Sequence, residues 1–191
     1  SSSRRHKQGG RTGKFVVAVL RSCSISLLLL LTVKMFNVFN FYIFDRKGTC
    51  LYYHEWLREH NPLSDNPGED TKLVFGLLFS LKQLGQKLTP GSDESDPVDY
   101  MKTGNVTSFA TNNFTLHQFE TASGLRFVLN TSKCKDHLLR DIQTSLRHVY
   151  SEIYVSIVVK NPLYKPGAKV TNPRFTKQLD RYMIGMAKRC S

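Results

Sequence analysis

Residues Leu27–Asp45, LLLLLTVKMFNVFNFYIFD, constrain the fold most, because the apolar pattern changes character within this run. Before Met35 it is the end of an apolar stretch, residues 15–33, whose single charge is Arg21. From Met35 on, aromatic and β-branched residues dominate, which is typical of a strand. A strand that is apolar on both faces lies inside a sheet whose two sides are both covered. We therefore predict that the folded domain begins here, with a central strand.

Strict alternation along this strand divides its side chains between two faces of the sheet. It predicts one face with Phe36, Val38, Asn40, Tyr42 and Phe44, and another with Asn37, Phe39, Phe41 and Ile43. The turn-forming residues DRKG follow, and the apolar run TCLYYHEW then predicts the second strand of a hairpin.

The rest of the chain predicts an α+β domain in the order ββαβββαα. Helical periodicity and turn residues place the later elements at about residues 69–88 (helix), 100–111, 114–121 and 125–131 (strands), and 135–160 and 173–188 (helices). We detect neither an internal repeat nor a second domain.

The first predicted helix is more apolar than a single sheet face can cover. Its leucines form one stripe, and Phe75 and Phe79 widen the apolar arc to roughly 240° at 100° per residue. Either loops of the same domain cover the two phenylalanines or a partner protein does. We expect a partner, and therefore place an interface at Phe75 and Phe79. The stripe consists of Leu73, Leu77, Leu81, Leu84 and Leu88.

The positive charge of the chain belongs largely to its first part. The net charge is +12, but residues 1–34 contain seven Lys and Arg and no acid, which leaves +5 for the remaining 157 residues. A stripe of cations with interleaved aromatic residues does not stand out in that remainder, so we do not expect nucleic-acid binding.

Residues of the kinds that carry catalysis or hold metals do not occur at suitable spacings. The six histidines fall on separate predicted elements, and the four cysteines form no C-x-x-C pair, so we interpret them as reduced thiols. A phosphate-binding glycine loop and a nucleophile motif are also lacking. We predict no catalytic, cofactor or metal site.

The N-terminal segment leaves a membrane alternative open. A basic start followed by residues 15–33 is also the order of a signal anchor, although five leucines contribute about −3 kcal/mol to insertion and an arginine opposes this with up to about +3 kcal/mol. Three glycosylation sequons, at Asn105, Asn113 and Asn130, would fit a type II luminal glycoprotein. All three lie in or beside predicted strands, where a glycan is hard to place.

Four segments, in this order along the chain, resemble the subunit 1 family of the TRAPP (trafficking protein particle) tethering complex, its small Bet-type longin subunits. They are FNFYIFDRKGTCLYYHEW (39–56), KLVFGLLFSLK (72–82), LHQFETASGLRFVLNT (116–131) and IYVSIVVKNPLY (153–164).

The resemblance implies a longin-like (SNARE-like) fold over residues 35–191, with a five-stranded antiparallel sheet, one helix on one face and two on the other. It also implies a non-enzymatic core subunit of a vesicle-tethering complex in endoplasmic reticulum to Golgi transport. Such a subunit lies in the cytoplasm, peripheral to these membranes and in contact with them only indirectly. With its sister subunits it would contribute to guanine-nucleotide exchange on an early-secretory Rab GTPase through a shared surface.

The resemblance also singles out Lys160, Asn161 and Pro162 at the end of the long predicted helix. This motif would either touch the GTPase or only end the helix. Residues 1–34 have no counterpart in the family pattern, so we expect them to be an extension outside the fold, and Met35 to be the natural start.

Two other classes share this fold. A longin-type SNARE should continue into a heptad helix and a C-terminal anchor. A small clathrin-adaptor subunit would be distinguished by the proteins that co-purify with it.

Overall fold

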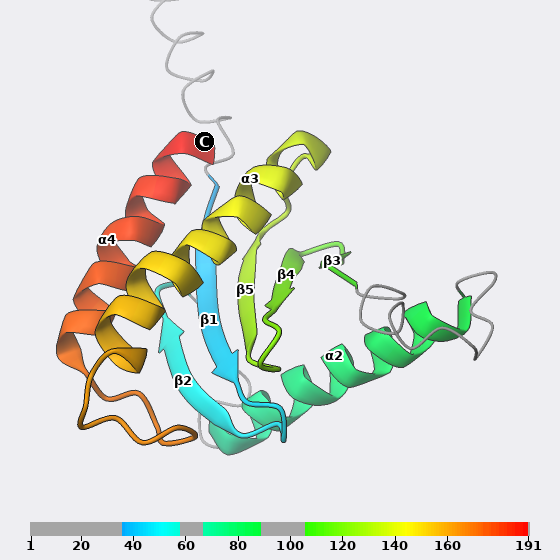
Figure 1. Cartoon of the computed structure of the whole chain (residues 1–191). Helices are drawn as coiled ribbons and strands as arrows, with labels where there is room; N and C mark the ends of the chain where they lie inside the picture. Colours follow the sequence, from blue (N-terminus) through cyan, green and yellow to red (C-terminus); the bar gives the residue numbers. More distant parts are fainter. Residues whose placement is uncertain (1–35, 58–66, 89–105, 191) are drawn as a thin grey trace, which may run out of the picture. The chain divides into compact units, whose positions relative to one another are not determined.

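Five strands form one antiparallel sheet in the spatial order β2-β1-β5-β4-β3 (Figure 1). The strands are β1 (Val38–Phe44), β2 (Cys50–Glu55), β3 (Ser108–Ala110), β4 (Phe114–Glu120) and β5 (Arg126–Ser132). Because β1 pairs with β2 on one side and β5 on the other, the predicted central strand is confirmed. The structure is a computed structural model, and it describes residues 36–57, 67–88 and 106–190.

Helices cover both faces of the sheet. Helix α2 (Pro67–Leu88) lies on one face, while α3 (Asp136–His148), its π-helical continuation η1 (Val149–Val159) and α4 (Pro173–Cys190) lie on the other (Figure 1). The predicted α+β, longin-like arrangement, with one helix on one face and two on the other, is confirmed.

The sheet therefore separates two apolar cores. The larger one joins Phe41 and Phe127 of the sheet to Ile142, Tyr154 and Phe175 of the helical layer, all of them almost completely buried. The smaller one joins the α2 side chain of Leu78 to the opposite side of the same strands, at Tyr42, Phe44, Leu116 and Val128. Burial of both faces of β1 is what its sequence predicts.

A β-bulge changes the predicted division of β1 between the two faces. Val38 pairs with Thr131 and Asn40 with Asn130, so Phe39 is an extra residue on β1. Its carbonyl oxygen accepts hydrogen bonds from the backbone N–H groups of Trp56 and Leu57, at 2.8 and 3.2 Å.

The bulge shifts the alternation by one residue. Phe36 and Val38 consequently share the larger core with Phe41 and Ile43, whereas Tyr42 and Phe44 face α2. The prediction that Phe36, Val38, Tyr42 and Phe44 share one face is therefore wrong, because a period of two cannot continue through a bulge.

Two later elements also differ from expectation. Strand β3 is confined to Ser108–Ala110, and residues 100–105 of the longer predicted strand lie outside the described residues. The long predicted helix changes to π geometry at Val149, and near its end the Lys160 N–H donates to the Val155 carbonyl at 3.0 Å. The Ser156 hydroxyl competes with backbone donors here, because it bonds to the carbonyl of Ile153 at 3.2 Å.

The hairpin between β1 and β2 is fixed by its predicted turn. Asp45 Oδ1 accepts the backbone N–H groups of Lys47 and Thr49 at 2.9 and 2.7 Å. Gly48 has φ +90°, a value that L side chains rarely adopt, and a Cβ atom there would lie 2.6 Å from Cε1 of Phe75 on α2. The glycine thus serves both the turn and the contact with the helix.

Replacement of Gly48 by alanine should destabilise the protein through two effects. The backbone strain costs about 1 kcal/mol, and the clash with Phe75 should raise the total to roughly 3 kcal/mol. Gly167→Ala is the matched control, because Gly167 has φ +84° and open space around it, so only the strain should remain. Urea unfolding of both variants measures the difference, and equal losses would contradict a close contact at Gly48.

A buried histidine links β4 to β5. His117 is 0% exposed, and its Nε2 lies 3.0 Å from Thr131 Oγ1. Thr131 donates its own proton to the Ser132 carbonyl at 2.9 Å, so its oxygen accepts from the His117 Nε2–H. Burial lowers the pKa of His117 from 6.5 to about 4, and the ring is neutral at neutral pH.

We expect this histidine to make stability depend on pH. In the unfolded chain His117 binds a proton below about pH 6.5, whereas in the folded protein it does so only below about pH 4. The free energy of unfolding should therefore fall as the pH is lowered from 6.5 to 4. This difference in the pKa of His117 corresponds to a loss of about 3 kcal/mol in the free energy of unfolding. Urea unfolding at several pH values should show this fall in the parent and a shallower one in His117→Gln.

Candidate partner interface on helix α2

Helix α2 is held on the sheet by a narrow part of its surface. Leu78 is only 2% exposed, and the neighbouring Val74 and Phe75 are partly buried against the same core. Burial of these side chains fixes the rotation of the helix about its axis.

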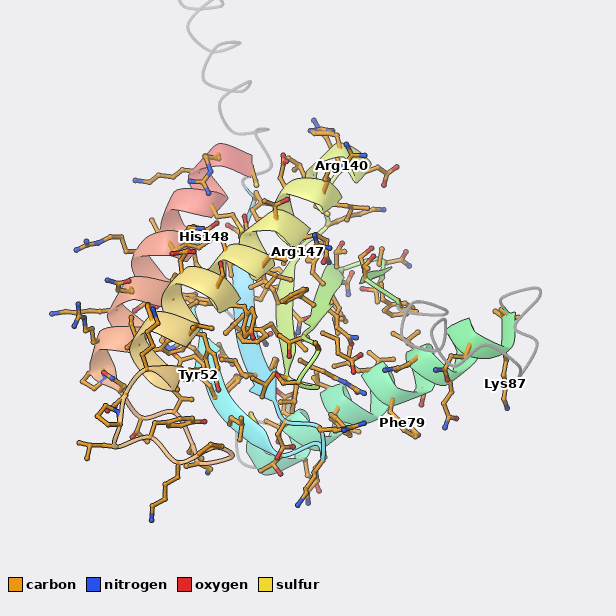
Figure 2. All side chains as sticks on the ribbon, viewed as in Figure 1. Tyr52, Phe79, Lys87, Arg140, Arg147 and His148 are labelled. Atoms are coloured by element: carbon orange, nitrogen blue, oxygen red, sulfur yellow. The ribbon has the colours of Figure 1, made fainter. Side chains whose placement is uncertain are left out.

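Polar contacts fix the position of α2 along the sheet. Near its start, the Tyr42 hydroxyl donates to Asp70 Oδ2 at 2.8 Å. Further along, Lys82 Nζ lies 3.0 Å from a carboxylate oxygen of Glu120 on β4. The last turns of the helix extend beyond these contacts, and Figure 2 shows Lys87 well past the strands.

Phe75 is covered by its own domain. Its ring centroid lies 5.6 Å from that of Phe44, and the guanidinium of Arg126 lies over the ring at 5.2 Å from its centroid. The Gly48 turn approaches it from another side. Phe75 could have been covered by its own domain or by a partner, and these contacts are with its own domain.

Phe79 and the leucines are exposed instead. Phe79 is 50% exposed and lies on one flank of α2, labelled in Figure 2. Leu73, Leu84 and Leu88 are 62, 53 and 71% exposed, and at 100° per residue they lie on the opposite flank. Among the described residues, α2 carries four of the eight large hydrophobic side chains that are exposed.

The sheet covers only part of the leucine stripe, because Leu77 packs against the smaller core while Leu73, Leu84 and Leu88 are exposed. The sheet-facing direction is that of Leu78, about 100° from the middle of the stripe. The sequence could not decide this, because the apolar arc is wider than the contact. The fit of Phe75 between Phe44, Gly48 and Arg126 selects the rotation.

Lys160, Asn161 and Pro162 lie elsewhere, at the end of η1 on the other side of the sheet. The Asn161 side chain accepts the Leu163 N–H at 3.1 Å, and its carbonyl accepts the Tyr164 N–H at 3.0 Å. The motif therefore ends the helix, and the structure does not bring it together with Phe75 and Phe79. Contact of this turn with a GTPase stays a prediction.

The described part of the chain offers little for catalysis. Residues 36–57, 67–88 and 106–190 contain no group of three His, Cys, Asp or Glu that could hold a metal ion. Burial raises the pKa of the Cys50 and Cys134 thiols, which disfavours the reactive thiolate. Within the same ranges, every helix is too short or too polar to cross a membrane.

The family model of the Sybindin-like family matches residues 38–185. The chain belongs to the Sybindin-like family. Its relatives include trafficking protein particle complex subunit 1 of Dictyostelium discoideum, which is 36% identical over 149 residues, 78% of this chain and 96% of the relative. The subunit 1 proteins of Rattus norvegicus and Homo sapiens are 39 and 38% identical over 147 residues, 77% of this chain and 92% of each relative.

The family and these relatives confirm the resemblance found in the sequence, and they support a subunit of a trafficking complex rather than an adaptor subunit or a SNARE. Among solved structures, Myxococcus xanthus MglB aligns with a TM-score of 0.40 and 10% identity over 63% of this chain and 85% of its own. That likeness is too weak to carry an argument.

Two of the sequons can be placed in this Sybindin-like domain. The Asn130 amide lies in β5 and donates to Asn40 Oδ1 at 2.8 Å, so a glycan there would break a contact within the sheet. Asn113 is exposed in the turn before β4. Asn105 and the apolar residues 15–33 lie outside the described residues.

We expect alanine substitutions of the two phenylalanines of α2 to have very different effects on the free energy of unfolding. Phe75→Ala should lower the free energy of unfolding by about 2 kcal/mol, because it removes a ring packed in the smaller core. Phe79→Ala should change it by less than about 0.5 kcal/mol, because its ring is half exposed. Urea unfolding of the two variants tests the rotation of α2, and a larger loss at Phe79 would contradict it.

Proposed function

We propose that this chain is a non-enzymatic core subunit of a vesicle-tethering complex of the kind for which its relatives are named. The observation that carries the proposal is the identity of 36 to 39% over more than nine-tenths of the relatives' length. Sister subunits are then its direct partners, and it holds no cofactor of its own.

The exposed side of α2 is the surface that we assign to a sister subunit. The interiors of protein interfaces are rich in large apolar side chains and depleted of charge. Leu73, Leu84, Leu88 and Phe79 fit that description, since they lie on flanks of α2 that the sheet leaves uncovered. A partner that reaches both flanks would enclose the projecting end of α2 on two sides.

The finer part of the proposal concerns the pathway and the GTPase. We infer that the complex acts between the endoplasmic reticulum and the Golgi, at the cytoplasmic side of these membranes. It would promote nucleotide exchange on an early-secretory Rab GTPase through a surface that several subunits build together. This chain would reach the membrane through the assembly, and no single side chain would carry the exchange step.

Asp substitutions on the leucine flank should remove the chain from its complex. The double variant Leu73→Asp, Leu84→Asp buries two carboxylates in the proposed interface, which should weaken assembly at least about 30-fold, or 2 kcal/mol. Neither leucine is buried in the domain, so the unfolding curve should change little. The measurement is the recovery of sister subunits with a tagged chain.

Ile184→Asp is the matched control, because Ile184 is an equally exposed aliphatic residue on α4, on the other face of the sheet. It should retain the sister subunits. Normal recovery with the leucine variant, or equal loss with both variants, would contradict the assignment to α2.

The exchange role has its own test. Purified complex that contains the parent chain should accelerate release of a fluorescent guanine nucleotide from the Rab GTPase, and the isolated chain should not. Acceleration by the chain alone would contradict a shared surface.

We also propose that residues 1–34 are dispensable for assembly, because the family match begins at residue 38. A chain that begins at Met35 should recover the same sister subunits as the full chain. A glycosidase-sensitive shift in the mass of the full chain would instead support the luminal alternative.

A further inference from the structure

The positive charge of the described residues is concentrated on one side of the sheet. Residues 133–190, which form α3, η1, the following loop and α4, contain twelve Lys and Arg but four Asp and Glu. The other described ranges, 36–57, 67–88 and 106–132, contain six cations and five acids. The side of the sheet opposite α2 therefore attracts anions.

A groove lies between η1 and α4 in this basic layer, with a volume of about 350 Å³. Its polar lining comes from His148 and Glu152 on one wall and from Gln178, Arg181, Tyr182 and Arg189 on the other. Figure 2 shows His148 on the side of its helix that faces α4.

Contacts with the Tyr182 ring position two of the polar side chains that line the groove. The His148 ring stacks on that of Tyr182 with centroids 4.8 Å apart, and the Arg189 guanidinium lies 5.9 Å from the centroid of the Tyr182 ring. The Arg189 side chain extends back along α4 toward Gly185, since its Nη1 atom would lie 3.7 Å from a Cβ atom at that position. Its guanidinium thus points toward the turn that carries Arg181.

We propose that this groove binds a phosphate-bearing anion. Two guanidinium groups, an imidazole and the Gln178 amide all supply N–H donors to one small space. A phosphate monoester has three acceptor oxygens and a charge near −2, which matches several such donors, whereas one carboxylate is satisfied by one guanidinium. Within the described ranges, neither arginine forms an ion pair with an acidic side chain.

Glu152 opposes an anion in this groove, which gives the proposal a distinctive consequence. A carboxylate beside a bound phosphate repels it, so removal of its charge should strengthen binding. A role of the arginines in folding alone would give no such gain.

The same chemistry could come from the headgroup of a phosphorylated lipid or from a soluble inositol polyphosphate. This site goes beyond the proposed function, in which the chain reaches the membrane only through its complex. It also lies on the other face of the sheet from the surface assigned to a sister subunit, so each proposal can fail without the other.

The experiment is titration calorimetry of the full chain with inositol hexakisphosphate, together with co-sedimentation on phosphatidylcholine vesicles with and without a phosphatidylinositol phosphate. Arg181→Glu and Arg189→Glu should each weaken binding about 10- to 100-fold, and Glu152→Gln should strengthen it several-fold. Arg189→Lys keeps the charge but loses the planar fork, and should fall between the parent and Arg189→Glu.

Arg174→Glu is the matched control, because Arg174 is an exposed cation of α4 that does not line the groove. It should change affinity less than about threefold. Binding to the soluble probe alone identifies a soluble ligand, and binding to the phosphorylated vesicles identifies a lipid. If the chain binds neither inositol hexakisphosphate nor the phosphorylated vesicles, the proposal is overturned.

Two further results would also overturn it. A loss with Arg174→Glu as large as that with Arg181→Glu would mean diffuse attraction rather than a site. Tighter binding of an oligoglutamate peptide than of inositol hexakisphosphate would mean that the groove takes an acidic protein segment.

Discussion

Burial of β1 on both faces is the constraint on which the rest of the structure depends. The strand lies inside the sheet and contributes Phe41 and Ile43 to one core and Tyr42 and Phe44 to the other. Neither core can form without it, because helices on opposite sides of the sheet pack against alternate side chains of the same strand. The bulge at Phe39 is tolerated because it lies where β1 begins, next to the end of β2.

Much of this fold follows from sequence periodicity alone, including the number, type and order of the elements. The failures have one physical cause, which is that periodicity does not record contacts distant in sequence. Alternation along β1 could not show that Phe39 would be left unpaired opposite Thr131 and Asn130. The pattern of α2 could not show its rotation, which is set by a turn some twenty-five residues earlier and by Arg126 on β5. The groove beside Tyr182 was missed because its two walls are distant in sequence, with His148 and Glu152 on one and Arg181 and Arg189 on the other, and they meet only when α4 packs on η1.

The two sides of the sheet carry different surface chemistry. The α2 side exposes leucines and Phe79, while the α3 and α4 side carries an excess of Lys and Arg around a polar groove. Apolar contact and electrostatic attraction respond differently to added salt, because ions screen charges but leave apolar burial largely intact. A domain with this division can hold a protein on one side while a weaker, salt-sensitive contact forms and breaks on the other.

The contact between Gly48 and Phe75 has a consequence for how such a surface can diverge. The ring of Phe75 rests where residue 48 lacks a side chain, so the absence of one methyl group in a hairpin turn contributes, together with Phe44 and Arg126, to which flank of α2 meets the solvent. A larger residue there would push the ring aside and turn the helix about its axis, which would present different leucines to the outside. A substitution in this turn can therefore alter the partner surface on α2 without changing any residue of the helix.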